Sequence, residues 1–157
     1  ILKEKKINIK FIFCGKTKDY RNKDYFNKIK NEIFKNDLDD YIKILGEVNK
    51  QKLYKLQRES LAMINCSLYE GWSTINEEAK KLNKFIFLSK IKGHLEQKNP
   101  GSIYFNLKSP EELSRKIINF IKSKKFIKDK ILYSKNLKLY KKNIRIAEEN
   151  LIKYYKL

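Results

Sequence analysis

Apolar runs alternate with more polar stretches along the first 121 residues. Residues 7–14, INIKFIFC, are mostly apolar and stop at Gly15, which is typical of a buried strand. Shorter apolar runs predict four more strands, at residues 41–45, 61–66, 85–88 and 103–105. Between the runs, apolar residues three to four positions apart predict helices over residues 23–35, near Leu53 and Leu56, over 74–84 and from Pro110.

The alternation of strands with helices also predicts how the strands pair. No Asn-Gly or Asp-Gly hairpin signal separates the runs, so the strands are expected to lie parallel, with helices on both faces of the sheet. We therefore predict an α/β fold with one Rossmann-like parallel sheet of five to six strands. Residues 122–157 end in an amphipathic pattern that predicts a C-terminal helix packed on the domain. No repeat or Gly/Ser linker divides the chain, so residues 1–157 are expected to form a single domain.

Composition is that of a soluble globular domain. Hydrophobic residues make up 41% of the sequence, which is enough to build a layered core. No apolar run approaches the ~18 residues that span a bilayer, and the lysine-rich start is unlike a signal peptide, so a cytoplasmic protein is expected. Cys14 and Cys66 lack the paired spacing of metal or redox motifs and are expected to be free, partly buried thiols.

The formal net charge of +19 raises two further classes of function, a nucleic-acid-binding module and a module that binds an anionic membrane surface. Only four of the basic residues are arginines, and no motif that reads nucleic acid is present, so a nucleic acid is not the expected partner. Residues 122–157 carry twelve basic and three acidic side chains, a local excess of +9. This segment keeps open a peripheral location at the inner face of the membrane.

The segment with the strongest chemical signal is residues 67–79, SLYEGWSTINEEA, which lead from the third strand into a helix. Ligands of open parallel sheets bind beyond the carboxyl ends of the strands. Thr74 and Glu77 fit a capping box, and the exposed amides of that first helical turn favour a diphosphate. Glu70 and Glu78 stand on either side, where each carboxylate could accept hydrogen bonds from the vicinal hydroxyls of a sugar.

These motifs resemble the C-terminal, donor-binding half of family 4 retaining glycosyltransferases, which have the GT-B fold. Glu70 and Glu78 have that family's E-x7-E spacing, within the family-like string SLYEG and before the dipeptide Glu78-Ala79. Four further strings follow the family's order between residues 7 and 121: FIFCG, LDDYIKILGEV, FIFLSKIKGHLEQ and SPEEL. The family-like core is therefore residues 7–121, and residues 122–157 form a basic, helical C-terminal segment.

The resemblance implies a donor site for a UDP- or GDP-linked sugar that works without metal or other cofactor. It implies transfer of a hexose-type sugar, with retention, to a glycan or lipid-linked acceptor that a separate N-terminal domain would hold. Glu70 would be catalytic and touch the donor sugar, Glu78 the ribose, and residues 46–48 the base. The implied donor-binding residues are Gly15, Gly46, Glu47, Val48, Glu70, Gly71, Trp72, Ser73, Thr74, Ile75 and Glu78.

This chain departs from the family pattern at two places. Trp72-Ser73 stands where the family usually has Phe-Gly, which puts the donor preference in doubt. The Arg and Lys that hold the diphosphate in the family have no match before residue 7. Four lysines at predicted strand-end loops are alternative cations or simply a solvated surface: Lys16, Lys18, Lys90 and Lys92.

Three other candidates have ordinary structural explanations. Asp37 and Asp39 form a D-x-D string, but it precedes a strand, at the wrong end of the sheet for a metal-bound ligand. His94 is the only histidine and is expected in the loop after the fourth strand, either making local hydrogen bonds or serving as a general acid or acceptor contact. Glu77 is expected to support the capping box.

Overall fold

The computed structural model describes residues 1–18, 22, 24–97 and 99–124, which form an α/β fold with parallel strands. This confirms the predicted fold class. The chain divides into two compact units, Ile1–Ser60 and Leu61–Leu157.

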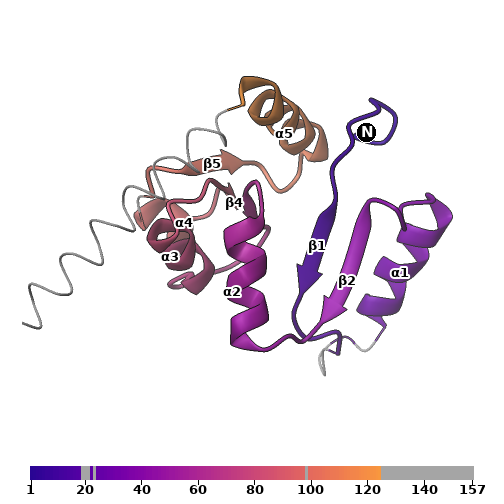
Figure 1. Cartoon of the computed structure of the whole chain (residues 1–157), viewed down its shortest axis with the longest axis horizontal. Coiled ribbons are helices and arrows are strands. Elements are labelled where there is room, and N and C mark those ends of the chain that lie inside the picture. The colour runs from indigo at the N-terminus through magenta and orange to yellow at the C-terminus, as the bar shows by residue number, and fades with distance from the viewer. Residues whose placement is uncertain (19–21, 23, 98, 125–157) are drawn as a thin grey trace, which may run out of the picture. The chain divides into compact units, whose positions relative to one another are not determined.

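The first unit pairs two parallel strands and carries two helices, drawn in indigo to magenta in Figure 1. Its elements are β1 (Phe11–Cys14), α1 (Tyr25–Lys35), β2 (Ile42–Gly46) and α2 (Lys50–Glu59). Phe11 lies opposite Ile42, and the register shifts by one residue so that Cys14 lies opposite Gly46. Helix α2 begins at an N-cap asparagine, because the Asn49 side chain accepts a hydrogen bond from the Lys52 amide at 2.9 Å.

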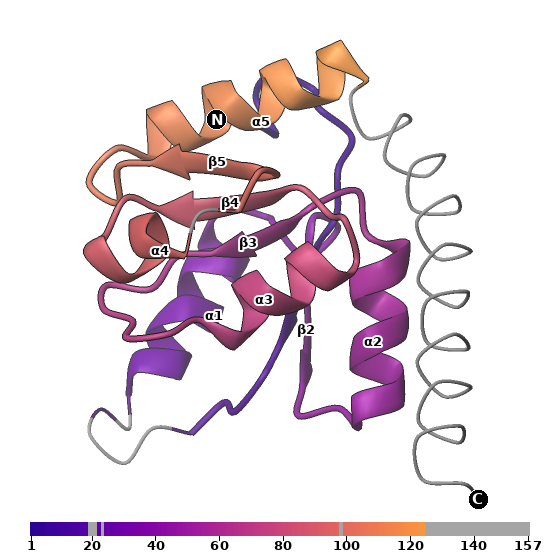
Figure 2. The same ribbon diagram turned by 90° about the vertical axis from the view of Figure 1, so that its left-hand side faces the viewer.

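The second unit has three parallel strands in the order β3-β4-β5, which lie side by side in Figure 2. Its elements are β3 (Met63–Asn65), α3 (Thr74–Lys81), β4 (Ile86–Ser89), α4 (Lys92–Glu96), β5 (Ser102–Phe105) and α5 (Pro110–Ser123). The central strand β4 is buried along its whole length. That explains its unbroken apolar sequence, because a central strand of a parallel sheet is covered on both faces.

Alternate side chains of β4 point to opposite faces of this sheet, and a helix packs against each face. Ile86 and Leu88 belong to a core cluster with Ala79 of α3. Phe87 points to the other face and meets the ring of Phe120 in α5 edge-on, with ring centroids 5.6 Å apart. Helices α3 and α5 therefore cover opposite faces, as the sequence predicted.

The strand pairing differs from the prediction of one sheet with five to six strands. The described residues form two sheets, one of two strands and one of three. The apolar pattern identifies strands, but it carries no information on which strand forms the hydrogen-bonded neighbour. The first strand is also shorter than residues 7–14, because its partner β2 begins only at Ile42, opposite Phe11.

Two further predictions concern the helices. Residues 92–96, expected to lie in a loop, form α4, a helix of five residues that is too short for a periodic pattern to reveal. Helix α5 ends at Ser123, followed by Lys124 in a left-handed conformation. The predicted C-terminal helix falls on residues 125–157, outside the described part of the chain. In that described part, no helix is long and apolar enough to cross a membrane.

Candidate functional site

The side chain of Asn65, the last residue of β3, organises the loop that leads to α3. Its carbonyl oxygen accepts hydrogen bonds from the Ser67 amide at 3.0 Å and from the Ser67 hydroxyl at 2.8 Å. Its amide nitrogen donates to Glu70 Oε1 at 3.3 Å and to Ser73 Oγ at 3.1 Å. One polar side chain at the carboxyl end of the strand therefore connects both ends of the loop.

These contacts fix the carboxylate of Glu70, the predicted catalytic residue. Ser67 Oγ lies 2.8 Å from Glu70 Oε1 as well as near Asn65, so its single proton is shared between two acceptors. Glu70 is half-buried, and its second oxygen has no hydrogen-bond partner among the described residues. One carboxylate oxygen is thus held by the protein while the other remains able to accept from a hydroxyl.

The capping box predicted at the start of α3 is wrong. The N-cap is Ser73, its side chain makes no capping hydrogen bond, and Thr74 is already inside the helix. Glu77 Oε1 accepts instead from Lys80 Nζ at 2.7 Å and from Gln97 Nε2 at 3.0 Å. The long side chain of Lys80 reaches back about one helical turn, and its hydrogen bond lowers the pKa of Glu77.

The first turn of α3 still has backbone groups for an anion. The first N–H groups of any α-helix lack an intrahelical acceptor, and here the helical positions begin with Thr74 and Ile75. Thr74 is exposed, whereas the side chain of Ile75 packs against the core cluster, so Ile75 offers only its backbone. Glu78 lies further along the same helix and is half-buried.

The turn before α3 is held close to α4 by a glycine. A Cβ built on Gly93 would lie 2.1 Å from the carbonyl oxygen of Glu70 and 2.9 Å from that of Gly71. Both contacts are with backbone, which has little freedom to move aside. Gly71 itself is exposed, and the neighbouring Trp72 is 65% exposed.

The remaining predicted site residues belong to the first unit. Gly15 and Gly46 end β1 and β2, and the Gly15 amide donates to the Gly46 carbonyl at 2.9 Å. Their φ angles of +140° and +67° lie in a region that side chains disfavour. Glu47 is exposed and Val48 half-buried in the turn that follows. The structure therefore brings Gly15 and Gly46 together at the carboxyl end of this strand pair.

His94 was predicted in the loop after the fourth strand, but it belongs to the short helix α4 and is completely buried. Its Nδ1 lies 2.9 Å from the Ser89 carbonyl oxygen, which can only accept, so Nδ1 carries the proton. Both cysteines are exposed, contrary to the prediction, since Cys14 ends β1 and Cys66 directly follows β3, where the chain leaves each sheet.

Charged candidates outside the loop are placed as follows. Asp37 pairs with Lys3 at 3.8 Å and lies with Asp39 between α1 and the start of β2. Lys92 pairs with Glu96 at 3.8 Å within α4. Lys16, Lys18 and Lys90 follow strands, as predicted. Within the described residues, no three His, Cys, Asp or Glu side chains gather in a way that could hold a metal ion.

Sequence reasoning missed Asn65, Gly93 and Gln97. A polar residue at the end of an apolar run was the available signal for Asn65, but the same signal occurs at many strand ends. Gly93 and Gln97 lie within the family-like string FIFLSKIKGHLEQ, and their contacts reach more than twenty residues back along the chain. Local pattern does not reveal such partners.

Comparisons with known proteins cover most of the chain. The sequence matches the family described as glycosyl transferases group 1 over residues 1–145. Its fold is similar to the crystal structure of Anabaena Alr3699/HepE in complex with UDP, with a TM-score of 0.66 and 19% sequence identity. The match covers 90% of this chain and 40% of that chain, and at this identity it establishes the fold alone. No curated protein matches the sequence.

Proposed function

Since this chain belongs to the group 1 glycosyl transferases, we propose that it is the donor-binding half of a retaining glycosyltransferase. The observation that carries the proposal is the carboxylate of Glu70, fixed by Asn65 and Ser67 directly before the N-terminus of α3. A sugar hydroxyl and a diphosphate need these two kinds of partner, an acceptor oxygen and a group of N–H donors.

In the proposed reaction, the bond between the anomeric carbon and the diphosphate oxygen breaks, and its electron pair leaves with the nucleoside diphosphate. The hydroxyl oxygen of a glycan or lipid-linked acceptor bonds to the same carbon on the same face, and its proton passes to an oxygen of the departing diphosphate. Negative charge grows on the diphosphate as it leaves. The N–H groups and the dipole of α3 would stabilise that charge, so the proposal requires no metal ion.

Each carboxylate has its own proposed role. Glu70 accepts from hydroxyls of the donor sugar, and Glu78 accepts from hydroxyls of the ribose. Contact of Gly46, Glu47 and Val48 with the base stays a prediction. The UDP in the HepE crystal makes UDP the first nucleotide to test, with GDP beside it.

Isothermal titration calorimetry of UDP, GDP, ADP and their sugars tests the proposal. We expect binding in the presence of EDTA, at the same Kd as with Mg²⁺. Glu78→Ala should weaken binding of the nucleotide itself about ten-fold or more, which is the loss of one charge-assisted hydrogen bond. Glu70→Ala should leave nucleotide binding in place and remove the additional affinity that the sugar provides.

Glu111→Ala is the matched control, because Glu111 is an exposed carboxylate in the first turn of α5 and should leave every Kd unchanged. Binding that disappears with EDTA would refute the metal-free site. A loss of nucleotide affinity in Glu70→Ala, with none in Glu78→Ala, would reverse the two roles. No binding of any nucleotide or nucleotide sugar would refute the proposal as a whole.

A further inference from the structure

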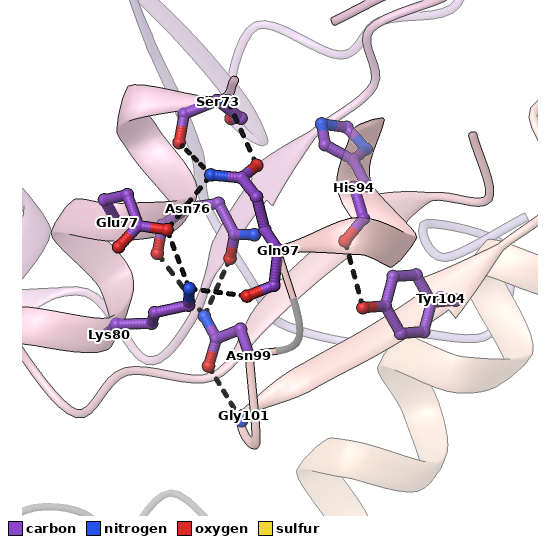
Figure 3. Close-up of polar contacts among 9 residues, drawn as sticks. All are labelled: Ser73, Asn76, Glu77, Lys80, His94, Gln97, Asn99, Gly101 and Tyr104. Carbon is purple, nitrogen blue, oxygen red and sulfur yellow. Dashed lines mark hydrogen bonds and ion pairs between the residues drawn. The ribbon is translucent and has the colours of Figure 1, made fainter. Parts of the chain in front are cut away.

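The side chain of Gln97 makes three hydrogen bonds to the start of α3, 20 to 24 residues earlier in the chain. Its Oε1 accepts from the Ser73 amide at 3.0 Å, and its Nε2 donates to the Ser73 carbonyl at 3.0 Å and to Glu77 Oε1 at 3.0 Å (Figure 3). Gln97 is 3% exposed and Ser73 is 1% exposed. The side-chain amide therefore pairs with both backbone groups of one residue, away from water.

The orientation of this amide is fixed by chemistry. The Ser73 N–H can only donate, and the Ser73 carbonyl can only accept, so the oxygen and nitrogen of Gln97 are not interchangeable. Ser73 is the N-cap of α3, yet its own hydroxyl accepts from Asn65 and makes no cap. Gln97 thus accepts from the amide of the N-cap residue, the hydrogen bond that the third helical residue of a capping box usually makes, and it does so from another segment.

Neighbouring contacts hold the two segments together around this amide. Lys80 Nζ donates to the backbone carbonyl of Gln97 at 2.5 Å and to Glu77 Oε1 at 2.7 Å. Asn99 Nδ2 donates to Asn76 Oδ1 in the first turn of α3 at 2.8 Å. At the other end of α4, Gly93 contacts the carbonyls of residues 70 and 71. The start of α3 is therefore held by a second segment at several points.

We propose that Gln97 is a positioning residue for the donor site, which sets the direction of the first N–H groups of α3 toward the diphosphate. This inference rests on the proposed function. A diphosphate contacts several N–H groups at once, so a small rotation of the turn lengthens several hydrogen bonds together. A turn that is already fixed before binding needs no ordering when the ligand arrives, and this raises affinity.

Two substitutions remove the interaction in different ways. Gln97→Leu leaves the buried Ser73 amide without its acceptor, and the Ser73 carbonyl keeps only the Glu77 amide, at 3.3 Å. Gln97→Glu keeps the shape and the acceptor for the Ser73 amide, but it places a carboxylate oxygen against the Ser73 carbonyl and the Glu77 carboxylate. Each variant should raise the Kd for UDP about ten-fold or more, the effect of losing one or two hydrogen bonds of ordinary strength.

A purely structural role for Gln97 would lower stability without changing the affinity of the folded protein. The control is Phe120→Leu, which weakens the core on the face of the sheet opposite α3 and should leave the Kd unchanged. Every variant is titrated at a temperature where urea unfolding shows it to be fully folded. In the double variant Gln97→Glu with Glu77→Gln, the amide at position 77 can donate to the carboxylate at 97, so part of the lost affinity should return.

Amide hydrogen exchange provides a readout that needs no ligand. The Ser73 amide should exchange about ten-fold faster or more in Gln97→Leu, because its acceptor is gone, while amides of β4 keep their wild-type rates. Unchanged Ser73 exchange, or variants that bind UDP as tightly as the wild type, would overturn the role of Gln97. Failure of the wild type to bind UDP, GDP, ADP or any of their sugars, with faster Ser73 exchange in the variant, would refute the proposed function and leave the positioning of the turn by Gln97 standing.

Discussion

At the scale of single residues, Glu77 illustrates how the structure uses an acid that the sequence assigned to a capping box. One of its oxygens accepts from both Lys80 and Gln97, and side-chain exposures of 30% for Glu77 and 27% for Lys80 leave the pair partly in contact with water. The hydrogen bond from Lys80 is the main cause that lowers the pKa of Glu77. Glu112 has a lowered pKa for the same reason, with Lys116 as its partner.

A lowered pKa makes stability depend on pH in a defined direction. The ionised form of Glu77 is favoured in the folded state, so its contribution is complete above the unfolded-state value of 4.5 and is lost as pH falls through the lower folded-state value. We expect the free energy of unfolding to fall below about pH 4.5 and to fall less in Glu77→Gln. Urea denaturation followed by the fluorescence of Trp72, the only tryptophan, measures it.

Glu47→Gln is the control for this titration, since Glu47 is an exposed carboxylate of the other unit. It should keep the wild-type acid sensitivity. An equal fall in stability for wild type and Glu77→Gln would contradict a role for the Glu77 carboxylate in acid denaturation.

At the scale of elements, β4 and α5 show which contacts hold the second unit together. Phe120 of α5 is 5% exposed and meets the rings of Phe85 and Phe87 edge-on, at centroid distances of 5.2 Å and 5.6 Å. Truncation of such a side chain removes its burial and leaves a cavity. These ring contacts fix α5 against the sheet and cover the face that α3 does not.

Phe120→Ala should therefore lower the free energy of unfolding of the second unit by about 3 to 5 kcal/mol. Phe34→Ala is the matched control, because Phe34 is 77% exposed and its truncation should cost less than about 0.5 kcal/mol. Urea denaturation curves of the two variants provide the comparison. Equal midpoints for Phe120→Ala and Phe34→Ala would show that α5 contributes little to this core.

Most elements of the fold could be predicted from the sequence, because each has a local pattern. The helix at residues 25–35 and the strand at residues 86–89 have periodic or unbroken apolar positions and lie within a few residues of their predicted ends. The grouping of strands into two sheets depends on hydrogen bonds between segments far apart in sequence. Helix α4 has only five residues, too few for a repeat.

In the candidate site too, only the features with a local sequence pattern could be predicted. The loop at residues 67–73 and the start of α3 were located because strand, turn and helix follow one another in the sequence. The hydrogen bonds of Glu70 and Ser73 could not be predicted. The capping-box rule considers only residues within one turn, so it does not identify Gln97 as the partner of Ser73. The amide of the N-cap residue Ser73 donates to Gln97, which belongs to another helix-strand connection and also donates to Glu77.

At the scale of the whole molecule, the chain spans 40% of the HepE chain to which its fold is similar. Under the proposed function, the donor site would lie in one half of a two-domain enzyme, and the acceptor would be held by the other half. Transfer needs the acceptor hydroxyl within ~3 to 3.5 Å of the anomeric carbon, in the correct direction. Binding of the donor alone does not meet this requirement.

We expect these 157 residues to bind a nucleotide sugar without transferring the sugar to an acceptor. Slow hydrolysis of the donor is compatible with this, because water needs no acceptor-binding half. The measurement uses labelled nucleotide sugars with candidate glycan and lipid acceptors, for this chain and for one extended at its N-terminus with an acceptor-binding half. Robust glycosylation by these residues alone would refute the division of roles between two halves.

The spacing between Gly93 and Gln97 could be used to recognise, in other chains, a helix start that is held by a second segment. The glycine is required by a backbone contact, and the glutamine, four residues later, by its hydrogen bonds to the backbone of the N-cap residue. Together they define a G-x-x-x-Q string after a buried strand, preceded 24 residues before its glutamine by the serine of an E-G-x-S turn. Two short strings at a fixed separation can be searched for where overall identity is too low to align. Chains that contain both are expected to build the first turn of this helix from two separate segments.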